Sequence, residues 1–132
     1  MWISLDAAYL GSSWICPEFR PQESFLSRLD SISINFSKAL LLGVGGSLLF
    51  IKDKAQFTES MSTTNQSNFS FYHNAFSKKN DITDYRNWII GADRRSSSLR
   101  FFYFFKYYGV ERLRIFVRSI DEKAKYLAKL ID

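Results

Sequence analysis

WISLDAAY (residues 2–9) and DSISINFSK (residues 30–38) are the two stretches that decide the fold class of this 132-residue chain. The first contains an apolar run that predicts a buried strand at 2–6. The second alternates polar and apolar residues, which predicts a strand at 31–36. Asp6 and Lys38 therefore follow two predicted strands at their carboxyl ends. Ligands of open α/β sheets bind just outside the carboxyl ends of strands, so this pair marks a candidate site.

The chemistry of this pair suits pyridoxal phosphate. The amine of Lys38 can form a Schiff base, and the carboxylate of Asp6 can keep a pyridine nitrogen protonated so that the ring acts as an electron sink. Each residue also has a plain structural interpretation. A strand-end Asp often caps a turn, and a Lys is usually a solvated surface charge. Spacing alone leaves both interpretations open.

Several longer motifs follow one another along the chain: LDAAYLGS at 5–12, ICPEFR at 15–20, NFSK at 35–38, DYRNW at 84–88, RRSSSLR at 94–100 and YGV at 108–110. Their residues and order resemble the aromatic L-amino acid decarboxylases, which are group II pyridoxal-phosphate decarboxylases. The resemblance covers nearly the whole chain. It implies an α/β fold, part of the large domain of a fold-type I pyridoxal-phosphate enzyme. That part is a mixed sheet with flanking helices, followed by long helices that lead to the small domain.

The resemblance also assigns roles to four residues. Asp6 would pair with the pyridine nitrogen, and Ala8 would pack under the cofactor ring. Asn35 would contact the cofactor near its phosphate, and Lys38 would attach the cofactor as a Schiff base. Together they form the predicted cofactor-binding set, with Lys38 also catalytic.

Three neighbours of Lys38 depart from the family pattern. The family has His before the Schiff-base Lys and Trp after it, where this chain has Ser37 and Ala39. Phe36 replaces a Pro or Ala. These changes alter the surroundings of the cofactor, whereas Lys38 itself is kept.

The resemblance divides the chain into two parts. Residues 1–95 would be the C-terminal part of the cofactor-binding large domain, and 96–132 would be linking helices. The polar stretch 59–81 lacks a sustained period and is predicted to be a mobile loop. It corresponds to the family's catalytic loop.

The family's catalytic loop carries a Tyr that protonates the substrate carbon after CO2 leaves. Tyr72 takes that position if the loop has lost one residue, and a phenol can act as a general acid. An ungapped match puts Phe71 there instead, which in this family is associated with aldehyde synthesis. We favour Tyr72, and an aromatic anchor for the loop is the structural alternative.

Other elements follow from local patterns. Residues 39–42 and 47–52 are predicted to be strands joined by a turn at Gly43–Gly46, and 23–29 a short helix. A Gly-rich phosphate loop is the less favoured interpretation of that turn.

Two helices are predicted after the serines at 96–98. The first, 99–108, is apolar almost all round and should be buried on several sides, ending at Gly109. The second, 110–131, has a stripe of apolar residues at steps of three and four, which is normally core.

Composition limits the function classes. The net charge is +5, and the basic excess lies in residues 61–132. These charges are spread along predicted helices, so we expect no nucleic-acid partner. The longest apolar stretch, 39–51, is too short to span a bilayer, which needs about 20 residues. With no signal peptide expected after Met1, we expect a cytoplasmic protein without membrane contact. The sequence contains one cysteine, Cys16, and one histidine, His73, which argues against a metal site.

The resemblance implies a function: pyridoxal-phosphate-dependent decarboxylation of an aromatic L-amino acid, in a homodimer. Because the resembling enzymes are much longer, this chain is expected to be an internal piece or a truncated member, incomplete for catalysis alone. Two alternatives remain. One is an inactive truncated paralogue that acts as an interaction protein, and the other is an aromatic aldehyde synthase of the same family.

Overall fold

The structure is a computed structural model that describes residues 1–61, 88 and 97–131. The chain divides into two compact units, Met1–Lys52 with Ser96–Asp132, and Asp53–Arg95. We describe each unit by itself. The division at residue 95 into a large-domain part and linking helices stays a prediction.

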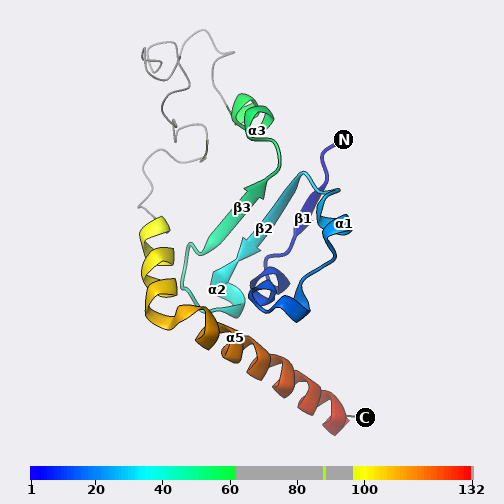
Figure 1. Ribbon diagram of the computed structural model, residues 1–132, viewed down its shortest axis with the longest axis vertical. Coiled ribbons are helices and arrows are strands. Elements are labelled where there is room, and N and C mark those ends of the chain that lie inside the picture. The colour runs from blue at the N-terminus through cyan, green and yellow to red at the C-terminus, as the bar shows by residue number, and fades with distance from the viewer. Residues whose placement is uncertain (62–87, 89–96, 132) are drawn as a thin grey trace. The chain divides into compact units, whose positions relative to one another are not determined.

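A three-stranded mixed sheet forms the centre of the first unit (Figure 1). Its strands are β1 (Ser4–Asp6), β2 (Ser31–Asn35) and β3 (Ser47–Ile51), in the order β1-β2-β3. β1 and β2 are parallel, and β2 and β3 are antiparallel. The expected mixed sheet with flanking helices is therefore confirmed. The first two predicted strands and the strand at 47–52 are present in slightly shorter form.

Short helices connect the parallel pair. The 3₁₀ helices η1 (Leu10–Ile15) and η2 (Pro17–Phe19) are followed by α1 (Glu23–Leu26). α1 ends three residues before the predicted end at residue 29. η1 lies close to the sheet because Gly11 has no side chain: a Cβ there would lie 2.7 Å from Cγ1 of Ile34.

The predicted strand at 39–42 is wrong. The chain forms α2 (Phe36–Ala39) immediately after β2, and Leu41 takes a left-handed backbone with φ of 57°. The backbone N–H groups of Leu40 and Leu42 both donate to the carbonyl of Phe36, at 3.2 Å each. Both leucine side chains are buried. The apolar run therefore packs inward from a helical turn, and Gly43–Gly46 leads from this turn into β3.

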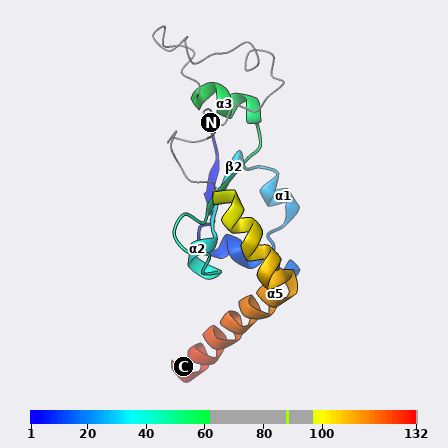
Figure 2. The same cartoon turned by 90° about the vertical axis from the view of Figure 1, so that its left-hand side faces the viewer.

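α5 (Ser97–Ile131) consists of two helical segments that meet at Gly109. Gly109 has φ of 71° and ψ of 158°, a conformation that favours glycine because it lacks Cβ. α5 changes direction between its yellow and orange parts in Figures 1 and 2. The predicted end of the first helix at Gly109 is confirmed.

Burial of the first segment of α5 on several sides is not observed. Phe36 contacts two of its rings edge-on, with centroids 5.6 Å from Phe101 and 5.8 Å from Phe105. The opposite side is open, as shown by the exposed side chains of Leu99, Phe102, Tyr103 and Tyr107. In the part of the chain that the structure describes, this segment is covered on one side only.

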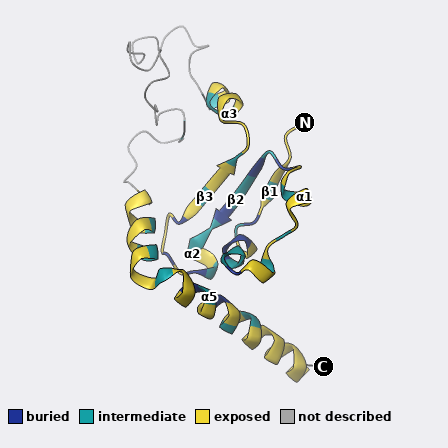
Figure 3. Ribbon diagram, viewed as in Figure 1, coloured by how far each residue is buried: buried dark blue, intermediate teal, exposed yellow. Residues whose placement is uncertain are grey.

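The second segment of α5 is covered only near its start. Leu113 and Val117 join Cys16 and Leu40 in the buried core. The other members of the predicted stripe are exposed: Val110, Ile120, Ala124, Leu127 and Ile131. Figure 3 shows this half of α5 largely in yellow. Among the described residues, only Leu113 and Val117 of the stripe are therefore part of the core.

The second unit contains α3 (Lys54–Met61). Oδ1 of Asp53 accepts a hydrogen bond from the backbone of Gln56 at 3.0 Å and so caps this helix. Phe57 lies 6.2 Å from Trp88 between ring centroids. The first three residues of the predicted mobile loop, 59–61, are thus helical, and 62–81 lie outside the described residues. Of the helices described, none combines the length and apolar character needed to cross a membrane.

Candidate functional site

Asp6 ends β1 and has an exposed side chain. Its Oδ1 accepts a hydrogen bond from the backbone of Ala8 at 2.9 Å, so one carboxylate oxygen closes the turn after the strand. The predicted turn-capping role therefore explains the hydrogen bond of Oδ1 but leaves Oδ2 without a role. Oδ2 contacts no described residue through a hydrogen bond or ion pair and remains open to a ligand.

Ala8 and Asn35 lie side by side at the same edge of the sheet. The backbone N–H of Asn35 donates to the carbonyl of Ala8 at 3.1 Å, and Ala7 donates to Ser33 at 2.9 Å. These bonds continue the parallel pairing beyond the last residue of β1. The side-chain Oδ1 of Asn35 accepts from the backbone of Ser37 at 2.9 Å and caps α2.

Lys38 lies in α2, directly after β2, and its side chain is exposed. Within residues 1–61, 88 and 97–131, no hydrogen bond or ion pair engages its Nζ. The structure therefore brings Asp6, Ala8 and Asn35 to one edge of the sheet, with the turn that carries Lys38 following from the same edge. Their roles toward a cofactor stay predictions. Tyr72 and its competitor Phe71 lie outside the described residues.

Ser37 has a structural role that the sequence pattern did not reveal. Its hydroxyl donates to the carbonyl of Gly43 and accepts from the backbone of Gly46, the latter at 3.0 Å. The departure from the family's His had marked this position. Nothing in the local pattern, however, pointed to a contact with the glycine loop.

Comparison with known proteins identifies the family. The family described as the pyridoxal-dependent decarboxylase conserved domain matches residues 1–132. The chain belongs to this family.

Named relatives agree with that assignment. Tryptophan decarboxylase 2 of Oryza sativa subsp. japonica is 34% identical over 131 residues, which are 99% of this chain and 26% of that protein. Phenylacetaldehyde synthase of Arabidopsis thaliana is 35% identical, again over 99% of this chain and 26% of that protein. The resemblance to aromatic amino acid decarboxylases is thus confirmed, and the family also includes aldehyde synthases.

A solved structure shows the same fold. The crystal structure of Oryza sativa TDC with PLP and tryptamine matches with a TM-score of 0.74 and 34% identity, over 86% of this chain and 22% of that chain. The expected part of a fold-type I large domain is therefore confirmed. This chain spans about a quarter of the length of the curated relatives it matches.

The polar groups at the sheet edge fit the cofactor of the pyridoxal-dependent family. Oδ2 of Asp6 is an acceptor suited to a protonated pyridine nitrogen, and Nδ2 of Asn35 is a donor suited to phosphate oxygens. Lys38 supplies the primary amine. All three are open to a ligand with respect to the described residues, and they follow adjacent parallel strands. This acceptor, donor and amine therefore match the chemical groups of pyridoxal phosphate.

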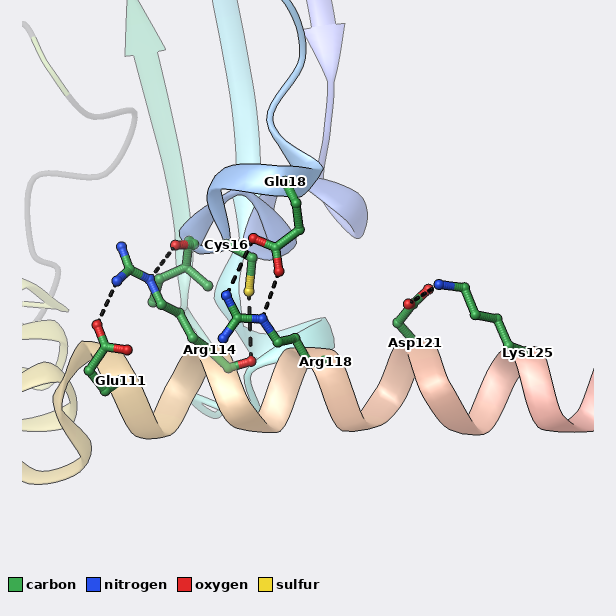
Figure 4. A network of polar contacts seen from close by, with 8 residues as sticks. Cys16, Glu18, Glu111, Arg114, Arg118, Asp121 and Lys125 are labelled. Atoms are coloured by element: carbon green, nitrogen blue, oxygen red, sulfur yellow. Dashed lines mark hydrogen bonds and ion pairs between the residues drawn. The ribbon is translucent and has the colours of Figure 1, made fainter.

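The ICPEFR motif at 15–20 anchors α5 (Figure 4). Nε of Arg114 donates to the carbonyl of Ile15 at 2.9 Å, and Nε of Arg118 lies 2.6 Å from Oε1 of Glu18. Cys16 is fully buried beside them, with Sγ 3.7 Å from the carbonyl of Arg114. Burial raises the pKa of the Cys16 thiol, which keeps it protonated and unreactive.

The Glu18–Arg118 pair makes a testable contribution to stability. The hydrogen bond from Arg118 lowers the pKa of Glu18 below its ordinary value of 4.5. A lowered folded-state pKa stabilises the fold above the unfolded value, and this contribution is lost as the pH falls through the lowered pKa. We expect Glu18→Gln to destabilise the protein at neutral pH and to match the wild type in acid.

Urea midpoints measured at neutral pH and at about pH 3 check this expectation. Glu122→Gln, at an exposed position of α5, the helix that carries Arg118, is the matched control. It should leave the urea midpoint close to that of the wild type at both pH values. A Glu18→Gln variant whose deficit is the same at both pH values would contradict the ion-pair explanation.

A shallow pocket of about 260 Å³ lies at the other end of the sheet. Leu29, Ile32 and Phe50 line it, together with Lys52, whose Nζ donates to the carbonyl of Ser27 at 2.8 Å. These residues surround the start of β2, whereas Asn35 ends that strand. The pocket is therefore separate from the edge that carries the predicted cofactor residues.

Proposed function

We propose that this chain is part of an enzyme that uses pyridoxal phosphate to decarboxylate an aromatic L-amino acid. The observation that carries the proposal is the position of Asp6, Asn35 and Lys38 after two adjacent parallel strands, in a chain of the pyridoxal-dependent decarboxylase family. When bound, pyridoxal phosphate supplies an electron sink for the charge left on the substrate carbon.

The hydrogen bonds of Asp6 and Asn35 support the roles proposed for them. Oδ2 of Asp6 holds the proton on the pyridine nitrogen, while Oδ1 stays engaged with Ala8 and fixes the carboxylate plane. Nδ2 of Asn35 donates toward the phosphate, because Oδ1 is committed to Ser37. The methyl group of Ala8 leaves room for the ring. Lys38 holds the cofactor, and Tyr72 donates the proton that replaces the lost carboxylate.

The whole activity requires more protein than these residues. The relatives are about four times as long, so the remaining cofactor and substrate contacts come from segments outside the matched quarter. We propose that the complete enzyme is a cytoplasmic homodimer. Isolated residues 1–132 should bind the cofactor weakly.

A chimera tests the proposal. Residues 1–132 replace the matched quarter of Oryza sativa tryptophan decarboxylase 2, and the purified protein is assayed for CO2 release from tryptophan, tyrosine and phenylalanine. We expect CO2 release that depends on added pyridoxal phosphate, with the unmodified rice enzyme as control. A chimera that folds and binds the cofactor yet releases no CO2 from any of the three would contradict the proposal.

The product separates decarboxylase from aldehyde synthase. Aldehyde synthesis is the alternative activity, because a phenylacetaldehyde synthase is among the relatives at 35% identity. Tyr72 as proton donor gives the amine, whereas Phe71 at that position gives the aldehyde with consumption of oxygen. Measuring amine, aldehyde and oxygen in the same assay distinguishes the two.

The exposed apolar side chains of α5 favour a second candidate, an inactive chain that binds another subunit. Leu127, Leu130 and Ile131 are each more than half exposed. A face of this kind on a protein surface is typical of an interface. An inactive chimera, together with an isolated 132-residue chain that assembles with the rice enzyme, would favour this function over catalysis.

A further inference from the structure

Three hydrogen bonds tie the turn that carries Lys38 to the glycine loop Gly43–Gly46. The hydroxyl of Ser37 donates to Gly43 and accepts from Gly46, and the carbonyl of Gly46 accepts from the backbone of Phe36 at 2.8 Å. Gly46 is thus bonded on both sides to the first turn of α2. These hydrogen bonds hold the glycine loop and the first turn of α2 together.

Ser37 and Gly46 are also complementary in size. A Cβ on Gly46 would lie 2.5 Å from Oγ and 3.0 Å from the backbone nitrogen of Ser37, closer than side chains normally approach. Only glycine at 46 allows the loop to reach the hydroxyl. A small hydroxyl residue at 37 and glycine at 46 therefore work as a pair.

Phe36 and Leu40, which flank residues 37–39, contact α5 and the core. Phe36 packs edge-on against Phe101 and Phe105 of α5, and Leu40 is 3% exposed in the core. Arg100 of α5 donates to the carbonyl of Val44 in the loop. Of the four residues of α2, Lys38 is the one with an exposed side chain.

We propose that Ser37 is a positioning residue for Lys38. A helix of four residues is not stable by its own hydrogen bonds, so its orientation depends on external anchors. Lysine has a flexible four-carbon stem, so the position of its backbone sets the region that its amine can reach. Ser37 supplies this through the glycine loop. The inference rests on the proposed role of Lys38 in holding pyridoxal phosphate.

Trapping of the cofactor measures the effect in the chimera with Oryza sativa tryptophan decarboxylase 2, which supplies the remaining cofactor contacts. Pyridoxal phosphate and borohydride convert accessible lysines to stable pyridoxyl-lysines, which peptide mass spectrometry assigns to positions. The rate at Lys38 is divided by the rate at Lys129, an exposed lysine near the end of α5. We expect Ser37→Ala to lower this ratio by about tenfold, the effect of losing two hydrogen bonds.

Two further variants separate positioning from general damage. Ser37→Thr keeps the hydroxyl and should retain the wild-type ratio. Gly46→Ala should lower the ratio in the wild-type background and have a smaller further effect on Ser37→Ala, because the clash involves Oγ. Hydrogen exchange at the Gly46 amide should rise in Ser37→Ala and not in Ser37→Thr, while the circular dichroism of all variants stays unchanged.

The outcomes distinguish the two proposals. A chimera with Ser37 intact in which Lys38 is trapped no faster than Lys129 overturns the role of Lys38 and with it the proposed function. Selective trapping at Lys38 that Ser37→Ala leaves unchanged overturns the positioning role alone. An equal loss in Ser37→Ala and Ser37→Thr also overturns it, because the hydroxyl then makes no difference.

Discussion

Lys38→Ala in the chimera with Oryza sativa tryptophan decarboxylase 2 is expected to lower decarboxylation by about a thousandfold or more. Loss of the primary amine removes the attachment point of the cofactor, and no neighbouring lysine is placed to replace it in the described part of the sheet edge. The side chain of Lys38 is exposed, so its removal leaves no cavity and should not affect folding. Initial rates of CO2 release at saturating pyridoxal phosphate measure the loss.

Two control variants make this result specific. Lys52→Ala removes a lysine from the other end of the sheet, where Nζ contacts Ser27, and should keep most of the activity. Lys38→Arg keeps the charge but has no primary amine, so it should be as inactive as Lys38→Ala. Substantial activity in either Lys38 variant would show that this residue does not hold the cofactor.

Leu113→Ala is expected to destabilise the chain by about 2–5 kcal/mol, the usual cost of truncating a buried leucine. Leu113 is 4% exposed and packs in the core with Cys16, Leu40 and Val117. The cavity would open where α5 is anchored to the ICPEFR motif. Urea denaturation followed by circular dichroism measures the change in free energy of unfolding.

Leu127→Ala is the matched control because Leu127 belongs to the same apolar stripe of α5. Its side chain is 57% exposed, so the substitution should change stability by only about 0.5 kcal/mol or less. Equal losses at Leu113 and Leu127 would mean that the second half of α5 is covered in solution, as it would be in an assembly of chains.

The two leucines show what a hydrophobic pattern can and cannot predict. The steps of three and four correctly predicted a helix and its apolar face, since periodicity reflects the geometry of the helix itself. Burial depends on another element that covers that face. Among the described residues, η1, Cys16 and Leu40 cover only the part of the stripe at Leu113 and Val117, so Leu113 is core and Leu127 is not.

Gly109 and the run at 39–42 show the same difference between local and long-range effects. Gly109 was predicted to end a helix, and its positive φ confirms this, because the preference of glycine for such a conformation is local. The run at 39–42 was predicted to be a strand, and it is not. The cap from Asn35 and the inward packing of Leu40 and Leu42 favour a helical turn, and both depend on neighbours in space.

By itself, the sequence determined the family, the two strands near 2–6 and 31–36, and the candidate residues at their carboxyl ends. Motifs and strand periodicity are properties of short segments, and they are readable without knowing what lies beside them. Only the tertiary structure decided that one oxygen of Asp6 is engaged with Ala8, and that Lys38 lies on a helical turn. It also decided that Ser37 bonds to a loop nine residues away. These contacts join segments whose mutual approach depends on the packing of the whole unit, which no local pattern encodes.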